Sequence, residues 1–80
     1  MSAIDFALRG EHITLDALLK ACGLAGSGGA AKIVIADGEV RVNGVAETRR
    51  GRKLRADDEV RLGSARVLLR AAASNAPPTA

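Results

Sequence analysis

One segment of the chain concentrates side chains that bind anions. From Arg41 to Arg55 it holds a single acid, Glu47, and six basic residues, which are Arg41, Arg49, Arg50, Arg52, Lys53 and Arg55. Its formal charge is therefore +5, whereas the 6 basic and 8 acidic residues elsewhere sum to −2. The planar guanidinium group fits phosphate oxygens through paired hydrogen bonds. Such a local excess indicates a polyanionic partner, most often nucleic acid and sometimes a membrane surface; a solvated loop is the alternative.

A second anion-binding pattern begins at Ser27, where "SGGAAK" opens a stretch with helical periodicity. Backbone N–H groups at a helix start carry the positive end of the helix dipole, and Gly28 and Gly29 let a phosphate approach them closely. Lys32 lies one turn further along and can extend its ammonium group to the same phosphate. The alternative is a flexible helix entry followed by an ordinary exposed lysine. The glycines do not form a dinucleotide fingerprint, because a helix and not a strand precedes them.

The elements around these patterns follow from hydrophobic periodicity. Residues 4–9 alternate apolar with other side chains and predict a strand at the edge of a sheet. A first helix is predicted between a Thr14 cap and Gly23, with an apolar stripe made of Leu15, Leu18, Leu19 and Cys22. A second helix is predicted between the Ser27 cap and Gly38, with a buried face made of Ala31, Val34 and Ile35.

After the second helix the apolar period changes to two. Val40 and Val42 flank Arg41 and predict a strand with the arginine on its outer side. Asn43-Gly44 is typical of a type I′ hairpin turn, in which both central residues have positive φ. Two more short strands are predicted at residues 60–62 and 65–70.

These elements predict a protein of the α+β class, with two helices packed on a short, mostly antiparallel sheet. The domain is predicted to span residues 1–70. Ile33 lies off the buried face of the second helix, and we expect it to pack against the N-terminal strand or the C-terminal segment. Residues 71–80 contain two prolines and no charge, a composition that predicts a disordered tail.

Length and composition exclude several classes of protein. A chain of 80 residues forms one domain with a thin core. It has one cysteine, Cys22, and one histidine, His12, which excludes an internal disulfide and argues against structural zinc. No set of nucleophile, base and orienting group occurs, so we expect a non-catalytic protein without a cofactor. We expect no membrane span and no secretory signal, and therefore a cytoplasmic location.

Residues 13–60 resemble the RNA-binding domain named after the fourth protein of the small ribosomal subunit, which we call the S-four domain. The shared features include Leu15-Asp16, a Ser-capped second helix with Ala31-Lys32, and the hairpin "GEVRVNG". Within the family the chain is most similar to the small stand-alone YbcJ-like proteins, which share the helix entry and the "ETRRGRKL" loop. Asp57-Asp58 is a departure, because such domains usually have Gly-Asp there.

The resemblance implies the fold of the alpha-L RNA-binding motif and RNA binding by the second helix's start, the hairpin and the loop after it. The predicted contacts are Ser27, Gly28, Gly29, Lys32, Arg41, Asn43, Arg49, Arg50, Arg52, Lys53 and Arg55. Arg41 and Arg55 have an alternative role in surface ion pairs with Glu47 or Glu39.

The expected partner is a structured RNA, because the chain has one aromatic residue, Phe6, and so lacks a platform for stacking unpaired bases. Ribosomal and transfer RNA are the candidates, and we expect a ribosome-associated monomer. The alternative function is that of an adaptor whose basic face docks an acidic or ribosomal protein.

Overall fold

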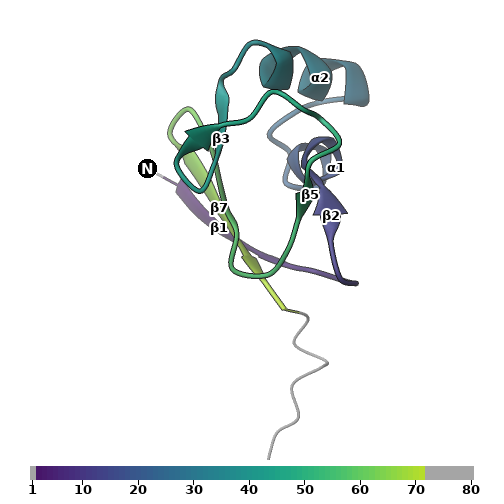
Figure 1. Cartoon of the computed structure of the whole chain (residues 1–80), viewed down its shortest axis with the longest axis vertical. Coiled ribbons are helices and arrows are strands. Elements are labelled where there is room, and N and C mark those ends of the chain that lie inside the picture. The colour runs from purple at the N-terminus through teal and green to yellow at the C-terminus, as the bar shows by residue number, and fades with distance from the viewer. Residues whose placement is uncertain (1, 72–80) are drawn as a thin grey trace, which may run out of the picture.

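Seven strands and two helices follow one another along residues 2–71, the part of the chain that this computed structural model describes (Figure 1). In chain order they are β1 (Ser2–Ala7), β2 (Ile13–Thr14), α1 (Leu15–Ala21), α2 (Gly28–Ala36), β3 (Val40–Val42), β4 (Val45–Ala46), β5 (Lys53–Leu54), β6 (Glu59–Leu62) and β7 (Ala65–Arg70). Of the predicted tail, residues 72–80 lie outside the described residues. Neither helix within the described range is long and apolar enough to cross a bilayer.

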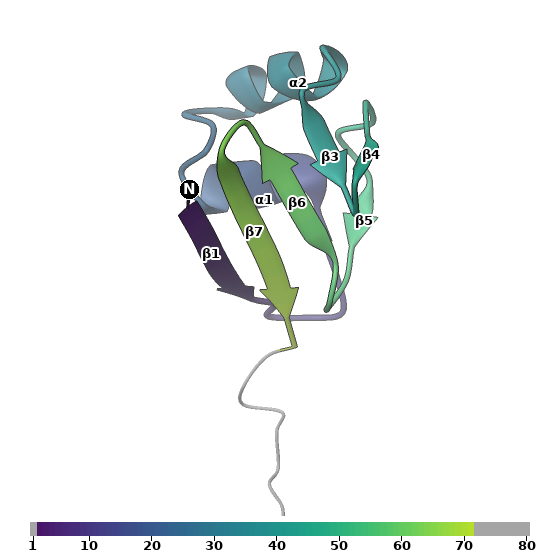
Figure 2. The ribbon, with the colours of Figure 1, turned by 90° about the vertical axis from the view of Figure 1, so that its left-hand side faces the viewer.

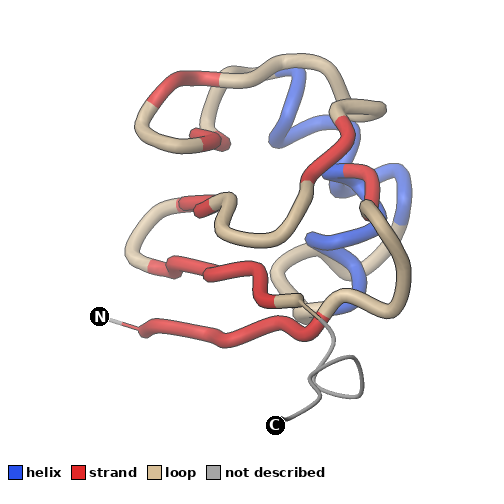
Figure 3. Tube along the Cα trace, turned by 60° about the horizontal axis from the view of Figure 1, so that its bottom comes forward, coloured by secondary structure: helices blue, strands red, loops and turns tan. Residues whose placement is uncertain are grey.

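The strands form two sheets. Five of them build one sheet in the order β1-β7-β6-β3-β4, and β2 pairs with β5 in a separate two-stranded sheet. β1 runs parallel to β7 at one edge, and every other pair is antiparallel. Both helices lie on one side of the large sheet, and its other face is turned away from them (Figures 2 and 3). The predicted fold class and the edge position of the first strand are confirmed.

Both helices end where their glycines predict. Gly23 has φ +74° and Gly38 has φ +77°, in the left-handed region that glycine adopts without steric cost. At the end of α1 the Leu24 N–H donates to the Leu19 carbonyl at 2.9 Å, which is the outer bond of a Schellman cap. The hairpin prediction is confirmed as well, since Asn43 and Gly44 have φ +54° and +85°.

The core lies between the helices and the inner face of the large sheet. Its fully buried members among the described residues include Leu15, Leu18, Leu19, Ala31, Ile35, Val40, Leu54, Val60 and Val67. The packing expected for Ile33 is wrong, because that residue is 62% exposed. Two residues along a helix lie about 200° apart, so Ile33 points away from the face that buries Ala31 and Ile35.

The turn before β6 uses a residue type that its backbone does not favour. Asp57 has φ +76°, and this is the position where the S-four resemblance leads us to expect glycine. The adjacent Asp58 does different work: its Oδ2 accepts the Arg55 N–H at 2.8 Å and its Oδ1 accepts Asn43 Nδ2 at 3.1 Å. Asp57 therefore has the strained backbone, whereas the hydrogen bonds of Asp58 stabilise the turn.

We expect Asp57→Gly to raise the free energy of unfolding by about 0.5–1 kcal/mol. A left-handed conformation costs a residue with a Cβ about 1–2 kcal/mol, and the freedom that glycine adds to the unfolded chain offsets part of the gain. Asp58→Gly is the matched control and should lower the stability, because it removes two hydrogen bonds. Urea unfolding at pH 7 measures the free energy of unfolding of both variants. A lower value for Asp57→Gly than for the parent would show that the backbone at Asp57 is not strained.

Candidate nucleic-acid interface

The basic loop, residues 47–52, joins β4 to β5, and its backbone is docked on the start of α1. The Leu15 N–H donates to the Arg52 carbonyl at 2.9 Å, and the Asp16 N–H donates to the Arg50 carbonyl at 3.1 Å. A helix start leaves four N–H groups without partners inside the helix, and the loop satisfies two of them. Pairing of β2 with β5 continues the same contact, so the C-terminal half of the loop is fixed against α1.

This docking replaces the side-chain cap predicted for α1. Thr14 occupies the N-cap position with an extended backbone, but its side chain makes no capping hydrogen bond. A hydrogen bond with Thr14 is instead the largest of the causes that lower the pKa of the Asp16 carboxyl, and the nearby charge of Arg50 acts in the same direction. Thr14 is thus at the predicted cap position, but the predicted side-chain cap is wrong, because the N–H groups at the helix start donate to the carbonyls of Arg52 and Arg50 and to the carboxylate of Asp16.

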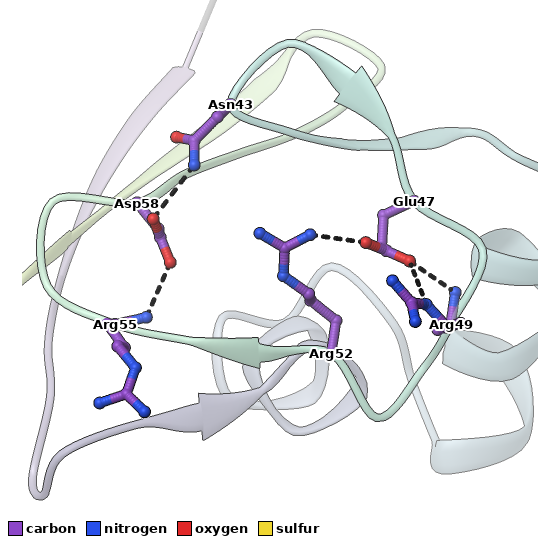
Figure 4. Close-up of polar contacts among 6 residues, drawn as sticks. All are labelled: Asn43, Glu47, Arg49, Arg52, Arg55 and Asp58. Carbon is purple, nitrogen blue, oxygen red and sulfur yellow. Dashed lines mark hydrogen bonds and ion pairs between the residues drawn. The ribbon is translucent and has the colours of Figure 1, made fainter.

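Glu47 is the one buried charged residue among residues 3–71, with 8% of its surface exposed. Arg52 Nη1 donates to Glu47 Oε1 at 2.7 Å, and Glu47 Oε2 accepts both the backbone N–H of Arg49 at 3.1 Å and its Nε at 3.3 Å (Figure 4). Hydrogen bonds from Arg52 and then from Arg49 hold the pKa of this carboxyl below its usual value. The alternative pairing of Glu47 with Arg41 or Arg55 is wrong.

The two arginines on Glu47 differ in what they leave open to a ligand. The side chain of Arg49 is 81% exposed, so one edge of its guanidinium is held by the carboxylate and the rest faces solvent. The side chain of Arg52 is 38% exposed and makes the shorter contact. In this arrangement Arg52 mainly braces the loop, and Arg49 is an exposed cation with a fixed direction.

Asn43 has a comparable bracing role in the hairpin. Its Oδ1 accepts the Glu59 N–H at 2.9 Å, and its Nδ2 donates to Asp58 (Figure 4). Both polar ends of the side chain are engaged, so they join the β3–β4 turn to the start of β6. Arg41 lies beside this turn on the outer face of the sheet and donates to the Gly44 carbonyl at 3.5 Å.

A hollow of about 360 Å³ brings two of the predicted patterns together. It lies between α2 and the basic loop and is lined by Lys32, Ala36, Thr48, Arg49, Arg50 and Gly51. Three basic residues from two separate segments therefore line one space, whose volume is near the lower end for a small-ligand site. Guanidinium and ammonium groups without an aromatic wall suit phosphate oxygens.

The other predicted residues do not line this hollow. Ser27 caps α2, since its hydroxyl accepts the Ala30 N–H at 3.1 Å, and Gly28 and Gly29 form the exposed first turn. Lys53 and Arg55 are exposed on and just after β5. Sequence reasoning missed the role of Glu47, for which the available signal was a lone acid with arginines two and five positions further along.

We expect Glu47→Gln to lower the free energy of unfolding at pH 7 by about 1–3 kcal/mol, because it removes the charge that strengthens the hydrogen bonds from Arg49 and Arg52 and leaves an amide N–H donor facing one of these donors. The folded pKa of Glu47 is lowered, so its contribution is complete above the unfolded value of about 4.3 and is lost as pH falls through the folded value. The variant should therefore lose less stability than the parent between pH 7 and pH 3. Urea unfolding of the parent and the variant at both pH values tests this. If both proteins lose the same free energy of unfolding between pH 7 and pH 3, the ionised Glu47 does not stabilise the fold through Arg49 and Arg52.

Comparison with known proteins adds to this geometry. A model of the family described as "S4 domain" matches residues 6–69. The chain is 47% identical over 49 residues to "Putative RNA-binding protein YbcJ" of Escherichia coli strain K12, and equally to "Uncharacterized protein YbcJ" of Shigella flexneri. Each alignment covers 61% of this chain and 70% of the relative.

Proposed function

This chain belongs to the S4 domain family, and on that premise we propose that it binds structured RNA through the hollow between α2 and the basic loop. One observation carries the proposal: Lys32 reaches this space from α2, and Arg49 and Arg50 reach it from the loop. The name of the Escherichia coli relative, "Putative RNA-binding protein YbcJ", supports the same function. RNA is the polyanion, and its phosphate oxygens are the atoms that these cations bind.

The fixed position of the loop favours binding. A long side chain usually loses conformational freedom when it holds a ligand, and this loss weakens the affinity. Glu47 already holds Arg49, and α1 already holds the backbone around Arg50, so part of that loss occurs on folding. A phosphate then meets cations whose spacing is set before it arrives.

The start of α2 extends this surface. Gly28 and Gly29 have no positive φ, and a Cβ at Gly28 would meet nothing within 4 Å. The fold therefore does not require glycine at these positions. Close approach of RNA to the exposed backbone N–H groups would explain why glycine occupies them. Ser27, Lys53 and Arg55 would add contacts from the two ends of this surface.

Recognition relies on phosphate groups and shape. Phe6, the only aromatic residue of the sequence, packs against the core and offers no platform for an unpaired base. Cations fixed on a rigid frame distinguish RNAs by the spacing of their phosphates, which depends on folded structure. A folded RNA bound by a monomer without a chemical step fits this arrangement, and ribosomal and transfer RNA are the candidates.

We expect the double variant Lys32→Glu/Arg50→Glu to weaken binding of a fluorescently labelled three-way-junction RNA by at least about a hundredfold. Losing two charge-assisted contacts of ~1.5–3 kcal/mol each accounts for this factor before repulsion is counted. Neither residue contacts Glu47, so the fold should persist. The slope of log affinity against log salt should also become shallower by about 1.4–1.8, because each phosphate contact contributes about 0.7–0.9.

The matched control is Arg9→Glu/Lys20→Glu, which makes the same change in charge outside the hollow. Circular dichroism melts of both double variants verify folding. Equal affinities for the two variants would remove the hollow from the interface. Retention of cellular partners after ribonuclease treatment, combined with a flat salt dependence for RNA, would instead favour an adaptor that docks an acidic protein.

A further inference from the structure

Three arginines lie side by side across the outer face of the large sheet. The strand register pairs Arg41 of β3 with Arg61 of β6, and Arg61 with Arg66 of β7. Their neighbours Val40, Val42, Val60 and Val67 are buried, and alternate residues of a strand point to opposite faces, so all three arginines point away from the core. We call this group the arginine row. Two of its members come from outside the basic segment of the sequence.

The arginine row carries more positive charge than its surroundings neutralise. Like charges directly opposite one another destabilise a sheet. Glu59 is the one carboxylate within ion-pair distance of the row among the described residues, at 3.8 Å from Arg61 Nε and 3.3 Å from Arg66 Nε. Arg66 Nε is nevertheless buried without a hydrogen bond, so the ion pair leaves this donor unsatisfied. The repulsion within the row is therefore costly for the sheet alone, and an anion at the exposed parts of the Arg61 and Arg66 side chains would offset it.

A hollow marks where the anion would bind. It has a volume of about 170 Å³ and is lined by Arg61, Gly63, Ser64, Ala65 and Arg66, at the turn between β6 and β7. Gly63 has φ +63° at the first central position of this two-residue turn, so the turn is tight. Its lining residues carry two guanidinium groups and one hydroxyl group, which are donors that can bind a phosphate group.

We propose that the arginine row and this hollow form a second RNA-binding surface, occupied by the sugar–phosphate backbone. The inference rests on the proposed function, because its ligand is a further part of the same RNA. Strands lie about 4.8 Å apart, so the row extends over about 10 Å, which suits a chain of phosphates better than one small anion. The sheet face points away from the helices (Figure 2), whereas the first hollow lies beside α2.

An RNA that reaches both surfaces must bend or branch around the molecule. A three-way-junction transcript is therefore the probe, titrated between 50 and 250 mM KCl, about the range where phosphate contacts change affinity strongly. The test variant is Arg61→Gln/Arg66→Gln. Its control, Arg9→Gln/Arg70→Gln, removes the same charge, partly from the far end of β7, where Arg70 pairs with Asp5 at 3.4 Å.

We expect the test variant to bind at least about tenfold more weakly than the control, with a salt slope shallower by about 1.4–1.8 than that of the parent. The amide signals of Gly63 and Ser64 in the parent should shift on addition of the RNA. Arg41→Gln breaks no carboxylate contact and should weaken binding in the same direction, which keeps the test valid if loss of the Glu59 pairs unfolds the double variant.

Two patterns of results separate the inference from the function on which it rests. In the first pattern, the parent binds RNA with a steep salt dependence and Lys32→Glu/Arg50→Glu weakens this binding. If the sheet variants then bind as tightly as their control, and the amide signals of Gly63 and Ser64 do not shift, the arginine row is not an RNA surface. If the parent itself binds no RNA with salt dependence, the proposed function fails first and the inference fails with it.

Discussion

The contact on which the rest of the site depends is the docking of the basic loop's backbone on the start of α1. Two carbonyl groups of the loop, from Arg50 and Arg52, accept the first N–H groups of the helix. The helix thereby gains its cap from the segment that carries the cations. This arrangement links stability to function, since a change that frees the loop also exposes unpaired N–H groups of α1. The loop therefore holds its charged side chains in a fixed direction because its backbone is docked on α1, and it needs no stiff residue types to do so.

Glu47 solves a second problem, which is repulsion within the loop. The three cations of the loop, Arg49, Arg50 and Arg52, repel one another, and a carboxylate in solvent would screen them only weakly. Because Glu47 is buried, its carboxylate is largely withdrawn from water, and it binds Arg49 and Arg52 over short distances. Glu47 lowers the net charge of the loop by one, and in return it fixes the side chains of Arg49 and Arg52 in position. We regard it as a positioning residue for the proposed RNA contacts.

Features set by a few neighbouring residues could be read from the sequence. The ends of both helices and the Asn43-Gly44 hairpin depend on local φ requirements that few residue types meet. By contrast, β2 and β5 have two residues each, which is too short for any period, and they pair across 40 residues of chain. The cap of α1, the partners of Glu47 and the arginine row also depend on long-range register. Sequence patterns carry no direct signal for such contacts.

Folding changes how the positive charge of this chain is grouped. Along the sequence Arg41 belongs to the basic segment, whereas the sheet places it next to Arg61 and away from the hollow that Lys32 and Arg50 line. The fold thus places the cations in two separate groups, and one acid contacts part of each group. Glu47 pairs with Arg49 beside the hollow, and Glu59 pairs with Arg61 and Arg66 in the arginine row. Under the proposed function and the further inference, a small domain without a stacking platform gains selectivity in this way, because a flexible polyanion satisfies either group alone, whereas only a folded one presents phosphates to both at the right separation.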